Sequence, residues 1–325
     1  MSATKPSTSI DQSPFHLSCL QGRVALLSGG GSGIGFEIAR QFLRHGCRAV
    51  VLCGRRENFL QKACDILQEE SARAATSSST TTALPSTTAT GAVATYQVCD
   101  VRNPADCQKA VTFCRDTFGA LDILVNGAAG NFLAKAADLK PKGFATVMAI
   151  DAQGTFNLSH AAFPLLKQTS ISNGSTAVVI NISATLQCPA TFWQAHASAA
   201  KAAVDSLTRS LALEWGTDQI RVVGIAPGPI ADTPGTTKLA PGLTQDDMNG
   251  MIAEGIPLGR LGRAWEIGHA AVYLASAQYV TGDVLVVDGG QWLYKPPMVP
   301  ADMVAQLSRQ VEAKSRAQAP TQSKL

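Results

Sequence analysis

Residues 24–35 read VALLSGGGSGIG, a short apolar run followed directly by a glycine-rich turn. In residues 36–43 the apolar side chains recur at the spacing of an α-helix. The stretch therefore predicts a strand, a tight turn and a helix. In such a turn, backbone N–H groups approach a pyrophosphate closely and the helix N-terminus adds partial positive charge. The stretch indicates dinucleotide binding, although any sharp strand-to-helix turn also favours glycine.

The composition is that of a globular protein with a substantial core. The chain has 325 residues, of which 46% are hydrophobic and 16% charged, and its formal net charge is +3. One large α/β domain or two small ones fit these values, whereas nucleic-acid binding, which favours a concentrated basic surface, gains little support. No apolar run is long enough to cross a bilayer, and the N-terminal residues lack the core of a secretory signal. We expect a soluble, intracellular protein.

The cysteines stand singly in apolar or helical contexts, with no CxxC pair and no histidine at metal-ligand spacing. They are Cys19, Cys47, Cys53, Cys64, Cys99, Cys107, Cys114 and Cys188. We expect reduced core residues rather than disulfides or metal ligands.

The last three residues, Ser323-Lys324-Leu325, have the form of a peroxisomal targeting signal that a receptor reads at a free C-terminus. The polar residues before them are suited to presenting such a signal. The tripeptide therefore predicts the peroxisomal matrix as the location and the peroxisomal import receptor as a partner.

Strands and helices are predicted to alternate along the chain. Apolar runs predict seven strands, at residues 24–27, 48–53, 94–100, 121–126, 177–183, 220–226 and 283–290. The helices between them are predicted from the glycine turn to about residue 45 and at residues 57–73, 104–118, 143–167, 198–215 and 265–276. This alternation predicts an α/β fold of Rossmann type, a doubly wound seven-stranded parallel sheet in a single domain.

That domain is expected to span residues 21–294, and four segments are expected to lie outside its sheet. Residues 1–20 are predicted to form a flexible arm, and residues 74–92 a Ser/Thr/Ala-rich, low-complexity insertion in a loop. Residues 233–259 are predicted to form a mobile lid over the site, and residues 295–325 a tail.

Two arginines follow the second predicted strand. In a Rossmann unit an acidic residue at this point holds the ribose 2′-hydroxyl, whereas arginine accommodates a 2′-phosphate. Arg55 and Arg56 stand here, with no acidic residue before Glu57. The sequence therefore favours NADP(H) over NAD, and the alternative is that both are solvated surface side chains.

Five motifs follow one another in the order typical of the short-chain dehydrogenase/reductase family, which the chain resembles over residues 20–293. They are the Gly29-x-x-x-Gly33-x-Gly35 turn, NGAAG at 126–130, SAAKAA at 198–203, PGPI at 227–230 and VDGG at 287–290. The resemblance implies that Lys201 binds the nicotinamide ribose and takes part in catalysis. It also implies a homo-oligomer whose contact is formed by the helices at 143–167 and 198–215.

The expected ligand sites lie at the ends of the predicted strands. NADP(H) is expected to contact Gly29, Ser32, Gly33, Ile34, Gly35, Arg55, Arg56, Asp100, Val101, Asn126, Lys201, Pro227 and Ile230. For an acyl-CoA substrate, Arg55 and Arg102 are suited to a CoA phosphate, because a guanidinium pairs bidentately with phosphate oxygens. Asn131 and Phe132 would flank the thioester and acyl chain, and the alternative for Phe132 is core packing.

The catalytic positions depart from the pattern of the family members that oxidise alcohols or reduce carbonyls. Those members place a tyrosine four residues before the lysine as the proton donor to oxygen, and here Ala197 occupies that position. The partner serine falls on Ala184, beside Ser183, and the usual helix asparagine is Asp151. Carbonyl reduction by the ordinary mechanism is therefore not expected.

Reduction of a conjugated acyl thioester needs no proton on oxygen, because hydride adds to the far end of the conjugated system and the proton ends on carbon. Residues 126–132, 196–205 and 226–230 are most similar to a peroxisomal branch of the family. That branch reduces 2,4-dienoyl-CoA to 3-enoyl-CoA with NADPH in β-oxidation of unsaturated fatty acids, and we expect this activity. A 2-enoyl-CoA reductase and a non-catalytic NADP-binding protein stay open as alternatives, whereas Ala197 disfavours a 3-hydroxyacyl-CoA dehydrogenase.

A carboxylate is the expected source of the proton on carbon, directly or through an ordered water. Asp151 is the first candidate, because Lys201 beside it would hold it ionised and aligned. Asp205 lies one turn beyond Lys201 and either orients its ammonium or forms an ordinary surface pair. Asp288 is better explained as a turn residue at a strand end. His196 is the remaining candidate acid, because a histidine side chain ordinarily changes charge near neutral pH, but a histidine at a helix start is more often structural.

Overall fold

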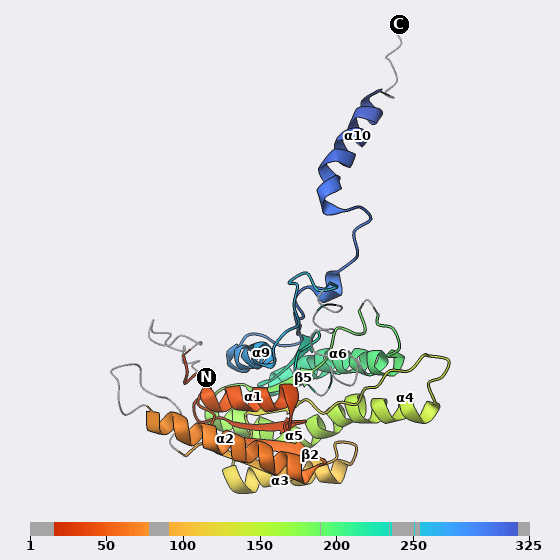
Figure 1. The fold of residues 1–325 in the computed structure, drawn as a ribbon. Coiled ribbons are helices and arrows are strands. Elements are labelled where there is room, and N and C mark those ends of the chain that lie inside the picture. Colours follow the sequence, from red (N-terminus) through yellow and green to blue (C-terminus); the bar gives the residue numbers. More distant parts are fainter. Residues whose placement is uncertain are drawn as a thin grey trace. The chain divides into compact units, whose positions relative to one another are not determined.

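The computed structural model describes residues 16–77, 91–188, 190–233, 235, 250 and 254–317. The chain divides into two units, residues 1–292 and 293–325, which are described separately. In the first unit, a seven-stranded sheet carries helices on both faces (Figure 1). This architecture confirms the predicted doubly wound Rossmann-type fold.

Seven apolar segments form the sheet. They are β1 (Val24–Ser28), β2 (Ala49–Gly54), β3 (Val93–Val98), β4 (Ile123–Asn126), β5 (Ala177–Ile182), β6 (Ile220–Pro227) and β7 (Val284–Val287). Every pairing is parallel, in the order β3-β2-β1-β4-β5-β6-β7. The direction of winding reverses between β1 and β4, and ligands of such sheets bind in the crevice at this switch point.

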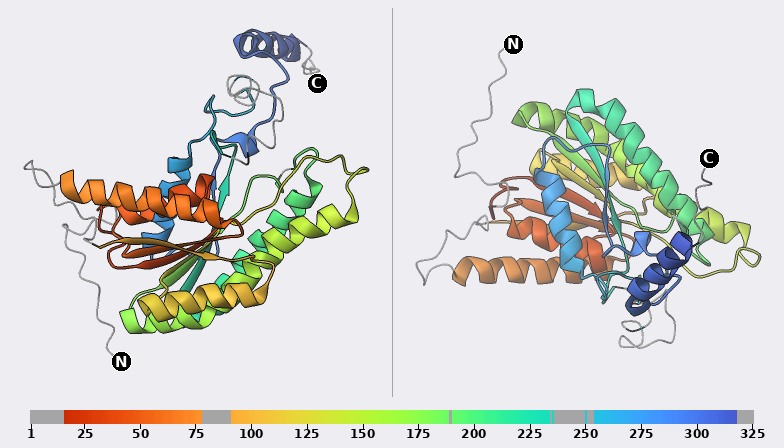
Figure 2. Two further views of the ribbon diagram at one scale, coloured as in Figure 1. Left: turned by 60° about the horizontal axis from the view of Figure 1, so that its bottom comes forward. Right: turned by 90° about the horizontal axis from the view of Figure 1, so that it is seen from above.

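Two layers of helices bury the two faces of the sheet (Figure 2). One layer is α1 (Gly33–Arg44), α2 (Glu57–Ser77) and α9 (Ala264–Ser276), and the other is α3 (Pro104–Phe118), α5 (Gly154–Asn173) and α6 (Ala195–Trp215). Successive strand residues face opposite layers, so that Leu27 packs with the first layer and Leu26 with the second. Asn103 caps α3 by accepting a hydrogen bond from the N–H of Ala105 at 3.0 Å, as predicted.

The turn between β1 and α1 depends on glycine. Gly29 has φ +70°, and a Cβ on it would lie 2.5 Å from the carbonyl oxygen of Gly127, which follows β4. A Cβ on Gly35 would lie 2.5 Å from the carbonyl oxygen of Gly29. These contacts hold the N-terminus of α1 close to the ends of β1 and β4, at the switch point of the sheet.

We expect the Gly29→Ala variant to be less stable than the Gly174→Ala variant by about 2 kcal/mol in free energy of unfolding. Both glycines have positive φ, +70° and +61°, but nothing lies within 4 Å of a Cβ on Gly174. Gly174→Ala therefore costs only the left-handed conformation, about 1 kcal/mol, whereas Gly29→Ala adds a clash with backbone. Urea unfolding of both variants measures the difference, and equal losses would contradict the packing argument.

The structure corrects several predicted boundaries. Leu20, predicted to lie in a flexible arm, is fully buried, and its N–H donates to the His45 carbonyl at 2.9 Å. Helix α2 continues to Ser77, into the predicted insertion, because residues 74 and 75 are alanines, which favour helix. The rest of the insertion up to residue 90, and residues 1–15, lie outside the described residues.

The helix predicted over residues 143–167 is three consecutive segments. They are α4 (Pro141–Met148), a π-helical turn η1 (Ala149–Gln153) and α5. A π turn admits an extra residue into the helix, which hydrophobic spacing does not reveal. Most of the predicted lid, residues 234, 236–249 and 251–253, lies outside the described residues.

The second unit contains a 3₁₀ turn (Ala301–Met303) and helix α10 (Val304–Ala317), so the predicted tail is partly helical. The targeting tripeptide lies outside the described residues. No helix in the described part of the chain is long and apolar enough to span a membrane.

The cysteines are free thiols. Six of the eight are buried, as predicted, but Cys188 is exposed and Cys19 is partly exposed. Within the described ranges, no three His, Cys, Asp or Glu side chains are placed to bind a metal ion.

Candidate active site

A buried ion pair lies between helix α6 and the π-helical turn. Lys201 Nζ is 3.1 Å from Asp151 Oδ2 and donates to the carbonyl of Ile182, at the end of β5, at 2.8 Å. The two side chains are only 8% and 1% exposed. Buried ions need partners of this kind, because removal from water is costly unless charge and hydrogen bonds compensate it.

Asp151 also fastens the loop that follows β4. Its Oδ1 accepts a hydrogen bond from the N–H of Gly130 at 2.7 Å. One carboxylate oxygen thus faces an ammonium and the other a backbone donor, so both oxygens are engaged. Asp151 therefore holds Lys201 and Gly130 in place.

Asp205 faces the loop after β5 rather than Lys201. Its carboxylate accepts hydrogen bonds from Ser183 Oγ and Gln187 Nε2. The predicted pair between Asp205 and Lys201 is therefore wrong, because a strong partner on another element, Asp151, draws the ammonium away from its helix neighbour.

The loop after β4 is joined to the start of α6. Asn131 Nδ2 donates to Gln194 Oε1 at 2.6 Å, and the rings of Phe132 and His196 stack with centroids 4.2 Å apart. Phe132 is 39% exposed, so it is not a core side chain. These contacts place Asn131 and Phe132, the predicted substrate neighbours, next to Gly130 and thus beside the ion pair. The predictions did not include Gln194, whose role depends on a contact 63 residues away in sequence.

His196 is the unusual group of this cluster. Its side chain is fully buried, and neither ring nitrogen forms a hydrogen bond of good geometry, although the backbone of Phe132 lies close enough to interact with the ring. Burial lowers the pKa of the imidazole, and the nearby Phe132 carbonyl and Asp151 carboxylate oppose this only in part. The imidazole is therefore neutral near pH 7, with one N–H donor and one acceptor.

The switch point of the sheet fits a nicotinamide dinucleotide. The first N–H groups of a helix have no partner within it, and Ser32, the N-cap of α1, uses no side-chain oxygen to cap them. Asn126 donates to Ser159 and Asn181 at 2.9 Å each, while its own Oδ1 is buried without a partner. Glycines, a helix N-terminus, an unsatisfied acceptor and Lys201 thus converge where a dinucleotide binds in such folds.

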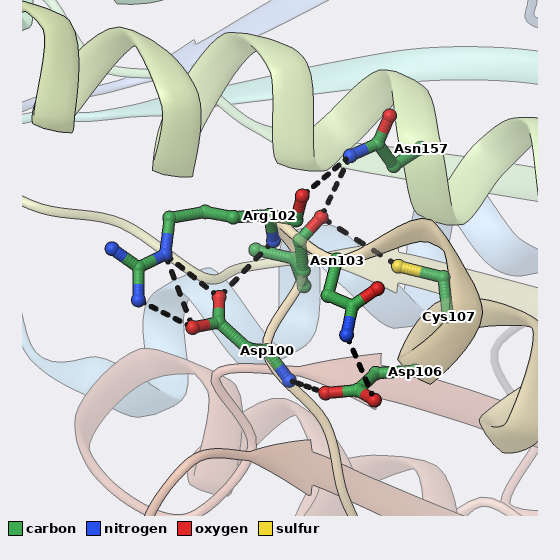
Figure 3. A network of polar contacts seen from close by, with 7 residues as sticks. Asp100, Arg102, Asn103, Asp106, Cys107 and Asn157 are labelled. Atoms are coloured by element: carbon green, nitrogen blue, oxygen red, sulfur yellow. Dashed lines mark hydrogen bonds and ion pairs between the residues drawn. The ribbon is translucent and has the colours of Figure 1, made fainter.

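The predicted contacts to the outer part of the cofactor lie around the ends of β2 and β3. Arg55 and Arg56 are exposed, and the Arg56 guanidinium lies 4.0 Å from the centre of the Phe59 ring. Asp100 and Arg102 pair with each other (Figure 3), with Arg102 Nε 2.9 Å from Asp100 Oδ1. Hydrogen bonds from Arg102 lower the pKa of the Asp100 carboxyl. A phosphate on Arg102 would have to compete with this pair.

Two side chains bind the backbone carbonyl of Val101, in the loop that follows β3. This carbonyl accepts hydrogen bonds from Asn157 Nδ2 at 3.0 Å and from the Cys107 thiol. The Val101 side chain is buried beside Gly154, where an added Cβ would lie 2.5 Å from Val101 Cγ2. Helix α5 thereby supports the loop that follows β3.

The remaining predicted residues lie near the ends of β6 and β7. Asp288 accepts hydrogen bonds from the N–H groups of Gly290 and Trp292 at 2.8 Å each, which confirms its role in a turn. Pro227 ends β6 and Ile230 is buried beside a cavity of about 440 Å³. A larger cavity, about 900 Å³, lies between α1 and the start of α9 and contains none of the predicted residues. We place the site at the ion pair, where the reactive side chains meet.

Comparison with known proteins identifies the family. A family described as enoyl-(acyl carrier protein) reductase matches residues 74–291, and one described as short chain dehydrogenase matches residues 23–83. The chain therefore belongs to the short-chain dehydrogenase/reductase family and is an oxidoreductase.

Two named relatives are similar in sequence to most of this chain. It is 48% identical over 311 residues to a protein of Arabidopsis thaliana named peroxisomal 2,4-dienoyl-CoA reductase, (3E)-enoyl-CoA-producing, with 94% of this chain and 96% of that protein covered. A protein of the same name from Mus musculus is 43% identical over 286 residues, covering 86% and 88%.

A solved structure supports the cofactor class. The fold is similar to the crystal structure of 3-ketoacyl-(acyl-carrier-protein) reductase from Brucella melitensis complexed with NADH. The TM-score is 0.70 at 27% identity, and 84% of this chain and 99% of that chain are covered. Together with the family, this similarity indicates a nicotinamide dinucleotide as the cofactor.

Proposed function

We propose that this protein reduces 2,4-dienoyl-CoA thioesters to 3-enoyl-CoA with NADPH. The observation that carries the proposal is that the motif lysine, Lys201, lies in a buried ion pair while Ala197, 1% exposed, occupies the family's position for a proton donor to oxygen. Such a site suits a reduction in which the proton ends on carbon. The names of the relatives from two kingdoms support the same substrate.

The proposed reaction balances with one NADPH and one proton. Bound NADPH supplies the hydride, which adds to C5 of the dienoyl group. The electron pairs shift to form a C3–C4 double bond and leave negative charge shared between C2 and the thioester oxygen. A proton then adds to C2, giving the 3-enoyl thioester and NADP⁺.

In this scheme the ion pair positions the reactants. Lys201 is proposed to hold the nicotinamide ribose with the N–H that neither Asp151 nor Ile182 uses. Both oxygens of Asp151 are already engaged by Lys201 and Gly130, so we propose that it orients a water that carries the proton to C2 instead of donating a proton directly. Asp205 is proposed to be a positioning residue that does not contact the substrate. Its carboxylate holds Ser183 and Gln187 beside the site.

We further propose that NADPH is preferred to NADH through Arg55 and Arg56, which are exposed at the end of β2. A 2′-phosphate there would pair with guanidinium groups that have no buried role in the fold. Arg55, with Arg102, is also proposed to meet a phosphate of CoA. A homo-oligomer formed through α5 and α6 is part of the same proposal.

The proposed location is the peroxisomal matrix, in line with the names of the relatives. Residues 323–325 are proposed to bind the import receptor. A fluorescent protein fused to the N-terminus of the chain is expected to accumulate in peroxisomes, and to stay in the cytosol when Leu325→Glu is introduced. Unchanged import of that variant would contradict the role of the tripeptide.

The substrate is tested by following NADPH oxidation with a 2,4-dienoyl-CoA and with the 2-enoyl-CoA of equal chain length. We expect the kcat/KM of the dienoyl thioester to be higher by at least about 100-fold, because its extended conjugation spreads the charge that forms. Preference for the 2-enoyl thioester would indicate the alternative enoyl-CoA reductase.

A further inference from the structure

His196 has hydrogen-bonding capacity that the fold does not use. Among the residues that the structure describes, the buried side-chain polar atoms without a partner are Asn126 Oδ1, Gln187 Oε1 and both ring nitrogens of His196. The first two are acceptors only, so the imidazole is the one donor in this set. Buried polar groups are almost always satisfied, and an exception needs an explanation, often a ligand.

The surroundings of His196 tie it to the proposed site. Its ring lies against Phe132, and the Asp151 carboxylate is close enough to influence its pKa. It is the neighbour of Ala197 at the start of α6, on the helix that carries Lys201. The imidazole therefore contacts the loop after β4 and lies in the neighbourhood of Asp151, and the thioester of a substrate is proposed to lie beside it.

Other polar groups nearby are partly engaged. Asn131 donates to Gln194, and its Oδ1 accepts the N–H of Phe132 at 2.8 Å. Lys201 is bound to Asp151 and Ile182. Both oxygens of Asp151 are engaged as acceptors, by Lys201 and by the Gly130 N–H. The imidazole of His196 differs from these groups, because it is fully buried and forms no hydrogen bond of good geometry.

We propose that the ring N–H of His196 donates a hydrogen bond to the thioester oxygen of the substrate and stabilises the negative charge that gathers there after hydride transfer. This inference rests on the proposed function and adds a residue to it. Phe132 covers the imidazole, so the thioester takes the place of part of the Phe132 ring, whose other side is exposed to solvent. A neutral imidazole suits this task, since it donates without contributing a proton to oxygen.

The test compares His196→Leu with His196→Gln. Leucine removes the donor, and glutamine retains an N–H. We expect kcat for a 2,4-dienoyl-CoA to fall about 100-fold in His196→Leu and less than about 10-fold in His196→Gln. NADPH affinity, measured by cofactor fluorescence, should stay unchanged in both. His160→Leu is the matched control, because His160 also stacks on a phenylalanine, Phe156, but is exposed.

A purely structural role for His196 predicts different results. Replacing an unsatisfied buried imidazole with leucine should leave the melting temperature unchanged or raise it, whereas a structural role predicts a lower melting temperature and equal losses in NADPH affinity and kcat. Wild-type kcat in a folded His196→Leu variant would overturn the inference and leave the proposed function intact. Absence of dienoyl-CoA turnover in the wild-type protein would instead overturn the proposed function.

A spectroscopic signal tests the hydrogen bond itself. With NADP⁺ bound, no hydride is available, so a 2,4-dienoyl-CoA labelled with ¹³C at the thioester carbon can be observed by isotope-edited infrared spectroscopy. We expect the carbonyl band to lie at lower wavenumber in the wild type and His196→Gln than in His196→Leu. An identical band in all three proteins would overturn the proposed hydrogen bond.

Discussion

Replacing Asp151 with alanine is expected to lower kcat for a 2,4-dienoyl-CoA by at least about 100-fold and to lower the free energy of unfolding by about 3–5 kcal/mol. The turnover falls because Lys201 and the water proposed to reach C2 lose their orienting group. The stability falls because Lys201, 8% exposed, is left as a buried charge with only the Ile182 carbonyl as a partner. Steady-state kinetics and urea unfolding measure the two effects separately.

Two further variants separate the effect of the Asp151 charge from the effect of its size and hydrogen bonds. Asp151→Asn retains an oxygen for the Gly130 N–H and is expected to recover part of the stability, but not the turnover. Asp122→Asn is the control, because Asp122 is also a buried carboxylate, bound to the Val24 N–H and to Asn173 near the opposite ends of the strands. It is expected to reduce stability while folded protein retains wild-type kcat. Wild-type kcat in Asp151→Asn would remove the carboxylate from the mechanism.

Replacing Arg55 with aspartate is expected to reduce the ratio of kcat/KM for NADPH to that for NADH by about 100-fold. A guanidinium that pairs with the 2′-phosphate becomes a carboxylate that repels it and can accept the ribose hydroxyls of NADH. Kinetics with each cofactor at a saturating dienoyl-CoA concentration give the ratio.

Arg115→Asp is the matched control for cofactor preference. Arg115 is an exposed arginine near the C-terminal end of α3, which contacts Arg48 before the start of β2, whereas Arg55 follows the end of that strand. The ratio should stay at the wild-type value in this control. A ratio that also stayed unchanged in Arg55→Asp would contradict the assignment of the 2′-phosphate to Arg55.

The fold was predictable because its signals are local in sequence. The strand and glycine turn of residues 24–35 need only neighbouring residues to be recognised, and the parallel order follows from alternating strands and helices. The Asp151–Lys201 contact was also predictable, because both positions belong to ordered motifs of the family. Its geometry, with both carboxylate oxygens engaged, was not.

The parts that were missed depend on contacts between distant segments. Asp205 has a suitable spacing from Lys201, but the ammonium is drawn to a π-helical turn that hydrophobic periodicity does not reveal. The burial of His196 requires Phe132, 64 residues earlier, to lie over its ring. A local pattern can indicate which residue types are present, but competition between partners decides which of them pair.

The position of the added hydrogens tests the proposed reaction most directly. The protein is incubated with a 2,4-dienoyl-CoA and NADPH deuterated on the transferred position, and in parallel with NADPH in D₂O, and the product is analysed by NMR. The account predicts a 3-enoyl thioester with deuterium from the cofactor at C5 and deuterium from water at C2. A 2-enoyl product, or cofactor deuterium at C3, would contradict it.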